Sequence, residues 1–206
     1  MESKAHWEHL YATQPVDNVS WFQAHADLSL RFIRGIGAPK TASVIDVGGG
    51  ASTLVDDLLR DGYSSLTVLD LSGQALAAAS ARLGARANAV DWIEADVTQV
   101  VPPVHAYDVW HDRAVFHFLT SPQDRLAYVE TVLRAVKPGG HVIVATFAED
   151  GPSQCSGLPV ARYSAEALHR EFGAPFLLVE HAKEEHRTPA GAVQKFVYCY
   201  CRTRNS

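Results

Sequence analysis

The chain has 206 residues, 47% of them hydrophobic and 20% charged, a balance that predicts one globular domain with a substantial core. Its formal net charge of -5 and its scattered lysines and arginines argue against a nucleic-acid partner. No run of 18 apolar residues occurs, the first ten residues contain no apolar signal segment and the three cysteines form no CxxC pair, so we expect a cytoplasmic protein with no membrane partner.

Two helices are predicted before the first strand. Residues 2–12 carry Trp7, Leu10 and Tyr11 at helical spacing, and residues 24–35 place further apolar side chains on one face. The segment between them is rich in turn residues. We expect residues 1–38 to form a helical lid on the rest of the domain.

From residue 42 the chain alternates between short apolar runs and amphipathic segments. The runs predict strands at 44–47, 66–71, 90–95, 107–112 and 141–148. The segments between or after them predict helices at 52–62, 72–84, 122–136 and 164–173. Strand–helix alternation predicts an α/β fold, a doubly wound, mostly parallel sheet with helices on both faces.

The last two predicted strands, 176–183 and 193–201, follow each other without a helix. They are expected to form an antiparallel hairpin at one edge of the sheet. The sheet then has seven strands, and residues 42–203 form its Rossmann-like core. We find no linker, so residues 1–206 are expected to be a single domain.

The first strand of this core contains Asp46, and the glycines Gly48, Gly49 and Gly50 follow it directly. Glycines adopt backbone angles that other residues avoid, and they leave backbone N–H groups unobstructed. A tight turn between strand and helix is one interpretation. The other is a loop that a ligand approaches closely, as expected at the carboxyl ends of strands in such sheets.

Acidic residues also end the next two strands. Asp70 is positioned to accept hydrogen bonds from both ribose hydroxyls of a nucleoside, and Asp96 to accept an adenine amine, with the Val97 N–H facing a ring nitrogen. Each acid has an alternative role as a helix cap or turn residue. Acids at three successive strand ends favour a nucleoside ligand.

These motifs together resemble those of class I S-adenosylmethionine-dependent methyltransferases. VIDVGGGAS resembles the first motif of the family, TVLDLS the second, EADV the third, and VKPGG the turn before the fifth strand. The spacing G-x-G-x-x-G of dinucleotide enzymes is absent, because its third glycine falls at Thr53. The resemblance implies S-adenosylmethionine as cofactor, and as cofactor-binding residues Trp21, Asp46, Gly48, Gly49, Gly50, Asp70, Leu71, Asp96, Val97 and His111.

The acceptor is indicated by a second, more local resemblance. WHDRAVFHF resembles the Trp-Asp-Arg-Gly-Ala-Leu segment of thiopurine and small-thiol methyltransferases, with His111 inserted and Ala114 in place of a glycine. The Asn/Asp-Pro-Pro-Tyr motif of nucleic-acid amino methyltransferases is absent. HWEHLYATQPVDNVSWF resembles the N-terminal aromatic segment of the thiol enzymes, but similar segments occur in small protein-lysine methyltransferases.

The same segment contains the predicted catalytic residues. Arg113 is positioned to lower the pKa of a thiol acceptor, unless it forms a salt bridge with Asp112 or another acid. Asp112 would contact the methionine end of the cofactor or orient Arg113. His111 and His117 are candidate bases for an amine or hydroxyl, although a histidine between Phe116 and Phe118 is more often packed.

Further residues are predicted near the substrate. Trp21 would close over the cofactor and Tyr11 would face the sulfonium, unless both only pack the lid helices. Arg162, in a long Gly/Pro/Ser-rich loop, would line the substrate pocket or anchor the loop. The histidines and cysteines lack ligand spacing, so no metal is predicted.

The sequence therefore predicts methyl transfer from S-adenosylmethionine to a small-molecule acceptor, with a thiol or other soft nucleophile first. Two alternatives stay open. The chain would methylate lysine in a protein partner, or it would bind the cofactor without catalysis.

Overall fold

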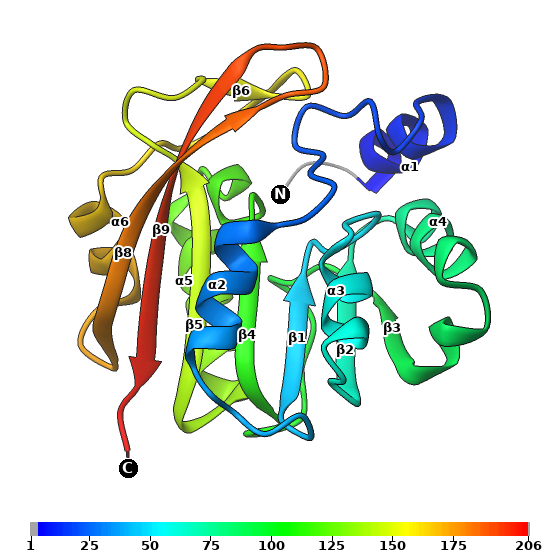
Figure 1. Ribbon diagram of the computed structural model, residues 1–206. Helices are drawn as coiled ribbons and strands as arrows, with labels where there is room; N and C mark the ends of the chain where they lie inside the picture. The colour runs from blue at the N-terminus through cyan, green and yellow to red at the C-terminus, as the bar shows by residue number, and fades with distance from the viewer. Residues whose placement is uncertain (1–3, 206) are drawn as a thin grey trace.

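A seven-stranded sheet forms the centre of the computed structural model, which describes residues 4–205 (Figure 1). Residues 2 and 3 of the first predicted helix lie outside the described residues. The strand order is β3-β2-β1-β4-β5-β9-β8. The strands are β1 Ser43–Val47, β2 Ser65–Asp70, β3 Val90–Glu94, β4 Tyr107–Arg113, β5 Val136–Phe147, β8 Phe176–Arg187 and β9 Val193–Thr203.

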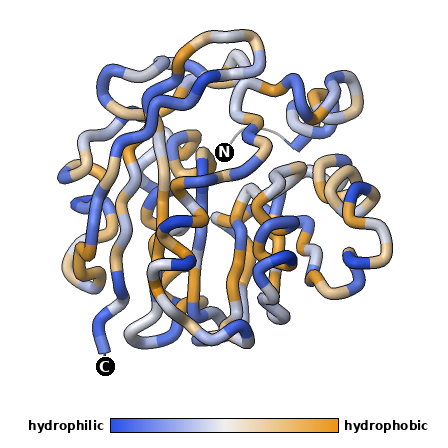
Figure 2. Tube along the Cα trace, in the orientation of Figure 1, coloured by the Kyte–Doolittle hydropathy of each residue, from blue (hydrophilic) through white to orange (hydrophobic). Residues whose placement is uncertain are grey.

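The pairing of these strands confirms the predicted fold class. β3, β2, β1, β4 and β5 pair in parallel, whereas β9 pairs antiparallel with both β5 and β8. The inner parallel strands read as nearly continuous apolar runs because helices bury both of their faces. β8 lies at the edge and is visibly more hydrophilic than β1 or β2 (Figure 2).

The helices begin and end near the predicted residues. They are α1 Lys4–Thr13, α2 Asp27–Gly35, α3 Leu54–Arg60, α4 Gly73–Leu83, α5 Pro122–Ala135 and α6 Ala165–Phe172. Serine side chains at Ser72, Ser121 and Ser164 accept backbone N–H bonds at the starts of α4, α5 and α6. These local caps explain why the sequence predicts the helix starts well.

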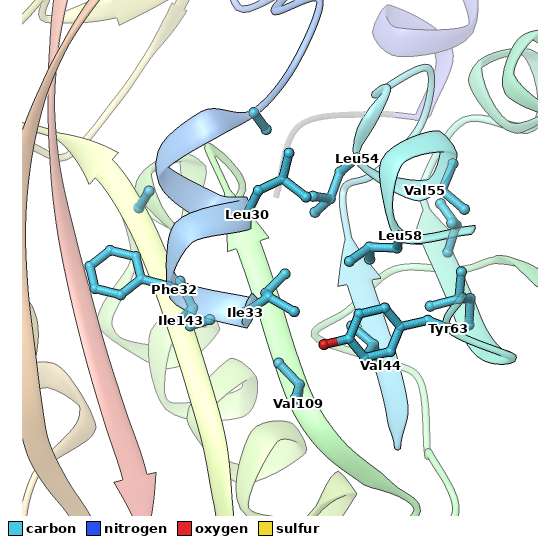
Figure 3. Close-up of a cluster of buried hydrophobic side chains, with 14 of the residues drawn as sticks. Leu30, Phe32, Ile33, Val44, Leu54, Val55, Leu58, Tyr63, Val109 and Ile143 are labelled. Atoms are coloured by element: carbon cyan, nitrogen blue, oxygen red, sulfur yellow. The ribbon is translucent and has the colours of Figure 1, made fainter. Parts of the chain in front are cut away.

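The helices form two layers around the sheet. Side chains of α2 and α3, among them Leu30, Ile33 and Leu54, pack with Val44 and Val109 of the sheet (Figure 3). A second buried cluster joins α5 and α6 to the other face. Burying both faces fixes the sheet as the rigid support on which loop residues are held.

Four local features differ from the predictions. β5 starts at Val136, because Val136 pairs with Tyr107 ahead of an irregularity in the β4–β5 register. β8 continues to Arg187, because its last residues pair with Val193–Phe196. The long loop after β5 contains a small hairpin of β6 Gln154–Cys155 and β7 Leu158–Pro159. Two 3₁₀ helices cover Gly84–Ala89 and Phe116–Phe118.

The topology brings the carboxyl ends of the parallel strands to one edge of the sheet, and α1 lies over this edge beside α4 (Figure 1). Loops after β1, β2, β3 and β4 therefore meet below α1. Within residues 4–205, no helix is long and apolar enough to cross a membrane.

Candidate cofactor and acceptor site

The glycine loop after β1 is shaped by close approaches that only glycine permits. Gly48 has φ 66°, donates its N–H to the Leu69 carbonyl at 2.7 Å, and leaves no room for a Cβ beside Val115. Gly50 has φ 33°, and a Cβ there would lie 2.6 Å from Asp70 Oδ2. The loop thus brings its backbone against the end of β2.

Asp46 points beneath this loop. Its Oδ1 lies 2.7 Å from Nδ1 of His111, whose Nε2 lies 2.8 Å from Ser29 Oγ. Its Oδ2 is buried and has no hydrogen-bond partner among the described residues, and a Cβ on Gly49 would lie 2.6 Å from it. A buried carboxylate oxygen left unpaired beside a glycine cradle suits a donor group of a ligand.

Asp70 ends β2 on the other side of the loop. Its Oδ1 accepts the Ser72 N–H at 2.8 Å, so it supports the turn while Ser72 caps α4. Burial, with smaller contributions from the nearby Asp46 and Glu8, raises the pKa of Asp70 to about 7 against the hydrogen bonds from Ser72 and Leu71. Asp70 therefore supports the turn after β2, whereas the predicted alternative of capping α4 falls to Ser72.

Two adjoining cavities open at this edge of the sheet. Cavity 1 encloses about 730 Å³ including its open mouth, and Asp70, Leu71 and Val97 line it. Cavity 2 encloses about 550 Å³ on the same measure, and Asp46 and Gly49 line it. The residues that line both, here called the junction, are Tyr11, Trp21, Gly48 and Arg113.

Arg113 is held from several sides at the junction. Its Nη2 donates to Glu184 Oε2 at 3.0 Å, its Nε to the Tyr198 hydroxyl at 3.1 Å, and its Nη1 to the Trp21 carbonyl at 3.3 Å. The side chain is only 8% exposed. The predicted alternative of a salt bridge with a neighbouring acid is thus present, and the acid is Glu184 of β8.

An aromatic wall closes the outer side of cavity 1; it consists of Trp7, Tyr11, Trp21 and Phe118. Trp7 makes edge-on contacts with Trp21 and Phe118, with ring centroids 5.9 Å and 5.2 Å apart. Cys155 of the β6–β7 hairpin lines the same cavity, and burial raises the pKa of its thiol to about 12. This part of the cavity is therefore apolar and suits a flat or soft ligand.

Asp96 and Asp112 lie outside both sets of lining residues. The Asp96 carboxylate accepts the Thr98 N–H at 2.8 Å, as its turn alternative requires. Asp112 lies on the side of β4 opposite to His111 and Arg113. There it accepts hydrogen bonds from the Tyr128 hydroxyl at 2.6 Å and from the Val115 N–H at 2.8 Å. Burial raises the pKa of Asp112 to about 6 against these hydrogen bonds. Neither carboxylate lines cavity 1 or cavity 2, because Asp96 is engaged by its own turn and Asp112 by Tyr128 and the Val115 N–H.

Gly50, His117 and Arg162 do not line the cavities either. His117 is fully buried against Phe118 and Phe147, and burial followed by the Arg113 charge lowers its pKa to about 3. Its Nδ1 lies 3.3 Å from the Phe147 N–H. Arg162 is exposed and donates to the Gly151 carbonyl at 3.2 Å, which anchors its loop.

Sequence reasoning missed Glu184, Tyr198 and Ser29, which complete the buried polar network around Arg113 and His111. Ser29 Oγ lies 3.4 Å from the Tyr198 hydroxyl and so connects the two ends of the network. The three residues come from α2, β8 and β9, and no local motif marks them. The missed position of Asp112 had a signal, because side chains alternate along a strand and Asp112 must oppose His111 and Arg113.

The described residues fit S-adenosylmethionine. Asp70, Leu71 and Val97 would hold the nucleoside in cavity 1, and Asp46 with the glycine loop would hold the amino-acid end in cavity 2. Among residues 4–205, no group of three or more His, Cys, Asp or Glu side chains is arranged to hold a metal ion.

Comparison of the sequence with protein families finds a match to the methyltransferase domain over residues 44–140. A similar protein is the ubiquinone/menaquinone biosynthesis C-methyltransferase of Roseobacter denitrificans, 30% identical over 116 residues, 54% of this chain and 45% of that protein. The ubiquinone biosynthesis O-methyltransferase of Citrobacter koseri is 28% identical over 58% of this chain and 48% of its own length. The match thus spans about half the length of these relatives.

Solved structures share the fold at low sequence identity. One, described by the conversion of a disulfide bond into a thioacetal group during echinomycin biosynthesis, has a TM-score of 0.77 and 18% identity, covering 98% of this chain and 92% of that one. A methyltransferase from Anabaena variabilis has a TM-score of 0.73 and 13% identity, covering 99% and 96%. Residues 44–140 thus match a methyltransferase domain, and the chain shares the fold of these solved structures.

Proposed function

We propose that this methyltransferase transfers the methyl group of S-adenosylmethionine to a small acceptor held against the aromatic wall of cavity 1. The observation that carries the proposal is the junction, where the cavity that contains the Asp46 carboxylate beneath the glycine loop meets an apolar cavity lined by Trp7 and Phe118. When bound there, the cofactor would supply an electrophilic methyl group on a sulfonium. The protein residues would align the two reactants and exclude water, which accounts for much of the catalysis in such substitutions.

The ionisable side chains around cavity 1 favour an acceptor whose nucleophile ionises without the help of a protein base. Tyr11 and Cys155 have pKa values raised by burial, so neither is a base near neutral pH. Asp70 has a pKa of about 7, which suits a base, but its carboxylate would be engaged by the ribose of the cofactor. A thiol, which ionises near pH 8.5 unaided, meets this requirement. A thiol or other soft nucleophile is therefore the first acceptor class.

A small aromatic acceptor methylated on oxygen or carbon is the second candidate. It is supported by the two relatives named for C- and O-methylation in ubiquinone biosynthesis and by the flat aromatic wall. Acidic phenols also ionise without a protein base. This candidate and the thiol differ in the reacting atom but share the same cavity.

We propose further that residues 1–38 act as a lid on a core over residues 42–203. Within the described part, the Glu8 carboxylate accepts the Gly73 N–H at 2.7 Å, and Gln23 Nε2 donates to Glu184 at 2.9 Å. Nε2 of His186 lies 2.8 Å from the Ser20 carbonyl. The contacts of Ser20 and Gln23 hold the residues on either side of Trp21 against β8, which supports Trp21 as the residue that closes over the cofactor. The three cysteines are free and buried, and on that ground we propose a cytoplasmic location.

An acceptor screen tests the proposal. Release of S-adenosylhomocysteine is measured with small thiols, quinols and phenols, amines, and a basic protein offered as lysine acceptor. We expect turnover with the first two classes and thiols leading. Turnover confined to the basic protein would replace the small acceptor with protein lysine. Cofactor binding without turnover in any class would favour a non-catalytic module.

A further inference from the structure

We infer that Glu184 sets the preference of the chain for S-adenosylmethionine over S-adenosylhomocysteine, because its carboxylate cancels the Arg113 charge at the junction. Glu184 lies in the C-terminal hairpin, far along the chain from the glycine loop and the acids of the cofactor site. The inference rests on the proposed function, since it concerns how that site treats a cationic cofactor.

The junction is where the sulfonium of the cofactor has to lie. The sulfur joins the nucleoside to the amino-acid chain, so it falls between the Asp70 side of cavity 1 and the Asp46 side of cavity 2. Arg113 lines both cavities at this point. A positive side chain therefore faces the position of a positively charged ligand atom.

Because Arg113 is buried, its charge acts strongly on a bound ligand. The Arg113 side chain is 8% exposed, and its guanidinium carbon lies 4.2 Å above the Phe196 ring. Little water or salt reaches such a group, so its field is weakly screened. Without an anion beside it, Arg113 would repel the sulfonium while leaving an uncharged thioether unaffected.

Glu184 supplies that anion. Its Oε2 lies 3.0 Å from Arg113 Nη2, and its side chain is 13% exposed. Within residues 4–205, Glu184 is the acidic residue that forms an ion pair with Arg113. The same Oε2 accepts the Tyr198 hydroxyl at 3.3 Å, and Gln23 binds Oε1, so the carboxylate is held in place by neutral donors.

Four further titratable groups that interact with Arg113 are neutral near pH 7, namely Tyr198, Cys155, His117 and His186. The pKa of Tyr198 is raised to about 12 by burial, and that of Cys155 is also about 12. Burial and Arg113 lower the pKa of His117 to about 3 and that of His186 below its usual value. None of them replaces Glu184 as the counter-charge. Asp46 and Asp70 also lie near the ligand, but they are unchanged in the variants below.

Comparison of the two ligands isolates the charge. S-adenosylmethionine and S-adenosylhomocysteine share the nucleoside and the amino-acid end, and they differ by one methyl group and one positive charge. A residue that only supports the pocket affects both alike. A residue that balances charge changes the ratio of the two dissociation constants.

The experiment measures both dissociation constants by calorimetry at pH 7.5 and low salt for the wild type and four variants. We expect Glu184→Gln, which keeps the side-chain shape, to weaken S-adenosylmethionine relative to S-adenosylhomocysteine by about tenfold or more. Arg113→Met should shift the ratio the other way. The double variant should return it to within about threefold of the wild type. Glu180→Gln, which breaks a surface pair with Arg31 on the same strand, is the matched control and should leave it unchanged.

Equal losses of both ligands in Glu184→Gln would overturn the inference and leave Glu184 a structural role. If circular dichroism shows that Glu184→Gln does not fold, Arg113→Met decides, and a ratio unchanged in it would overturn the inference. Failure of the proposed function has a different signature, in which the wild type itself binds neither ligand.

Discussion

The imidazole of His111 and the carboxyl group of Asp46 form a buried pair beneath the glycine loop, with 2.7 Å between Nδ1 and Oδ1. Both ring nitrogens of His111 have partners, because Nε2 lies 2.8 Å from Ser29 Oγ. His111 is therefore placed to orient Asp46, whose second oxygen is left for a ligand. It has no ring nitrogen free to serve as a base.

Replacement of His111 by Phe tests this positioning role. The ring is retained in volume, but Asp46 loses its partner and the cofactor loses an oriented acceptor. We expect S-adenosylhomocysteine to bind about tenfold more weakly and the free energy of unfolding to fall by about 1–3 kcal/mol, the scale for an orphaned buried polar group. Calorimetry and urea unfolding measure the two effects. His141→Phe, which removes a half-buried histidine paired with Tyr200, is the control and should leave cofactor affinity unchanged. Normal binding by His111→Phe would show that Asp46 needs no partner.

Asp70 should make cofactor binding depend on pH. Its pKa is raised to about 7 by burial, so a carboxylate able to accept both ribose hydroxyls is fully present only above that pH. We expect the affinity for S-adenosylhomocysteine to decline as the pH falls below about 7. Asp70→Asn should remove that decline, and Asp70→Ala should weaken binding at pH 8 by roughly 1.5–3 kcal/mol. A wild-type affinity that is flat between pH 5 and 8 would leave Asp70 as a turn residue only.

Asp70 should also make the free energy of unfolding depend on pH, in the direction opposite to that of cofactor affinity. Because the folded pKa of Asp70 lies above its ordinary value of 3.8, the folded chain binds the proton more tightly than the unfolded chain. The stabilising contribution is present below pH 3.8 and is lost as the pH rises through about 7. Asp70→Asn should therefore unfold at higher urea concentration than the wild type at pH 8. Equal midpoints at pH 8 would argue against a buried carboxylate at this position.

His117 should contribute to acid destabilisation rather than to the pH dependence of turnover. Its folded pKa of about 3 lies below the ordinary 6.5, so the unfolded chain takes up a proton first as the pH falls. Stability from the neutral ring is present above pH 6.5 and is lost between 6.5 and 3. In His117→Phe, the free energy of unfolding should fall less between pH 6.5 and 3 than in the wild type. For each protein this fall is measured relative to its own value at pH 8. The pH–rate profile of the variant between pH 6 and 9 should match the wild type. Complete loss of turnover in a folded His117→Phe protein would instead favour a base role and an amine acceptor.

Replacement of Ala114 by glycine should stabilise the protein. It lines cavity 1 with φ 76°, a left-handed conformation that costs a non-glycine residue about 1–2 kcal/mol. Ala114→Gly should raise the free energy of unfolding by about 0.5–1 kcal/mol, as the lost strain outweighs the added chain entropy. Ala95→Gly changes another alanine lining the same cavity, which has no positive φ, and should lower stability by a similar amount. Urea denaturation compares the three proteins. A destabilised Ala114→Gly would mean that the positive φ carries little strain.

The strands, helices and their order follow from local sequence properties. Apolar runs long enough for a buried strand, amphipathic segments with serine caps such as Ser72, and two final strands without a helix predict the sheet with few alternatives. The glycine loop and Asp70 belong to the same class of information. They lie in or beside the turn that they shape, so their neighbours in sequence are also their neighbours in space.

Local patterns extend less far into the site. Asp96 and Asp112 look alike in sequence, as acids near strand ends, yet each is engaged by its own turn or by Tyr128 of α5. Strand alternation places Asp112 opposite Arg113, but it does not say which face meets a cavity. That choice depends on how the helices cover the sheet.

The fold class, the glycine loop and Asp46 can be predicted from local patterns, because they depend on hydrophobic periodicity and on contacts within a few residues. The role of Arg113 depends instead on contacts between distant segments. Its partner Glu184 is 71 residues away, on an antiparallel strand, and Tyr198 and Trp21 come from two further segments. A buried charge is governed by whichever groups surround it in space, and that set is assembled only when the sheet closes around its last hairpin.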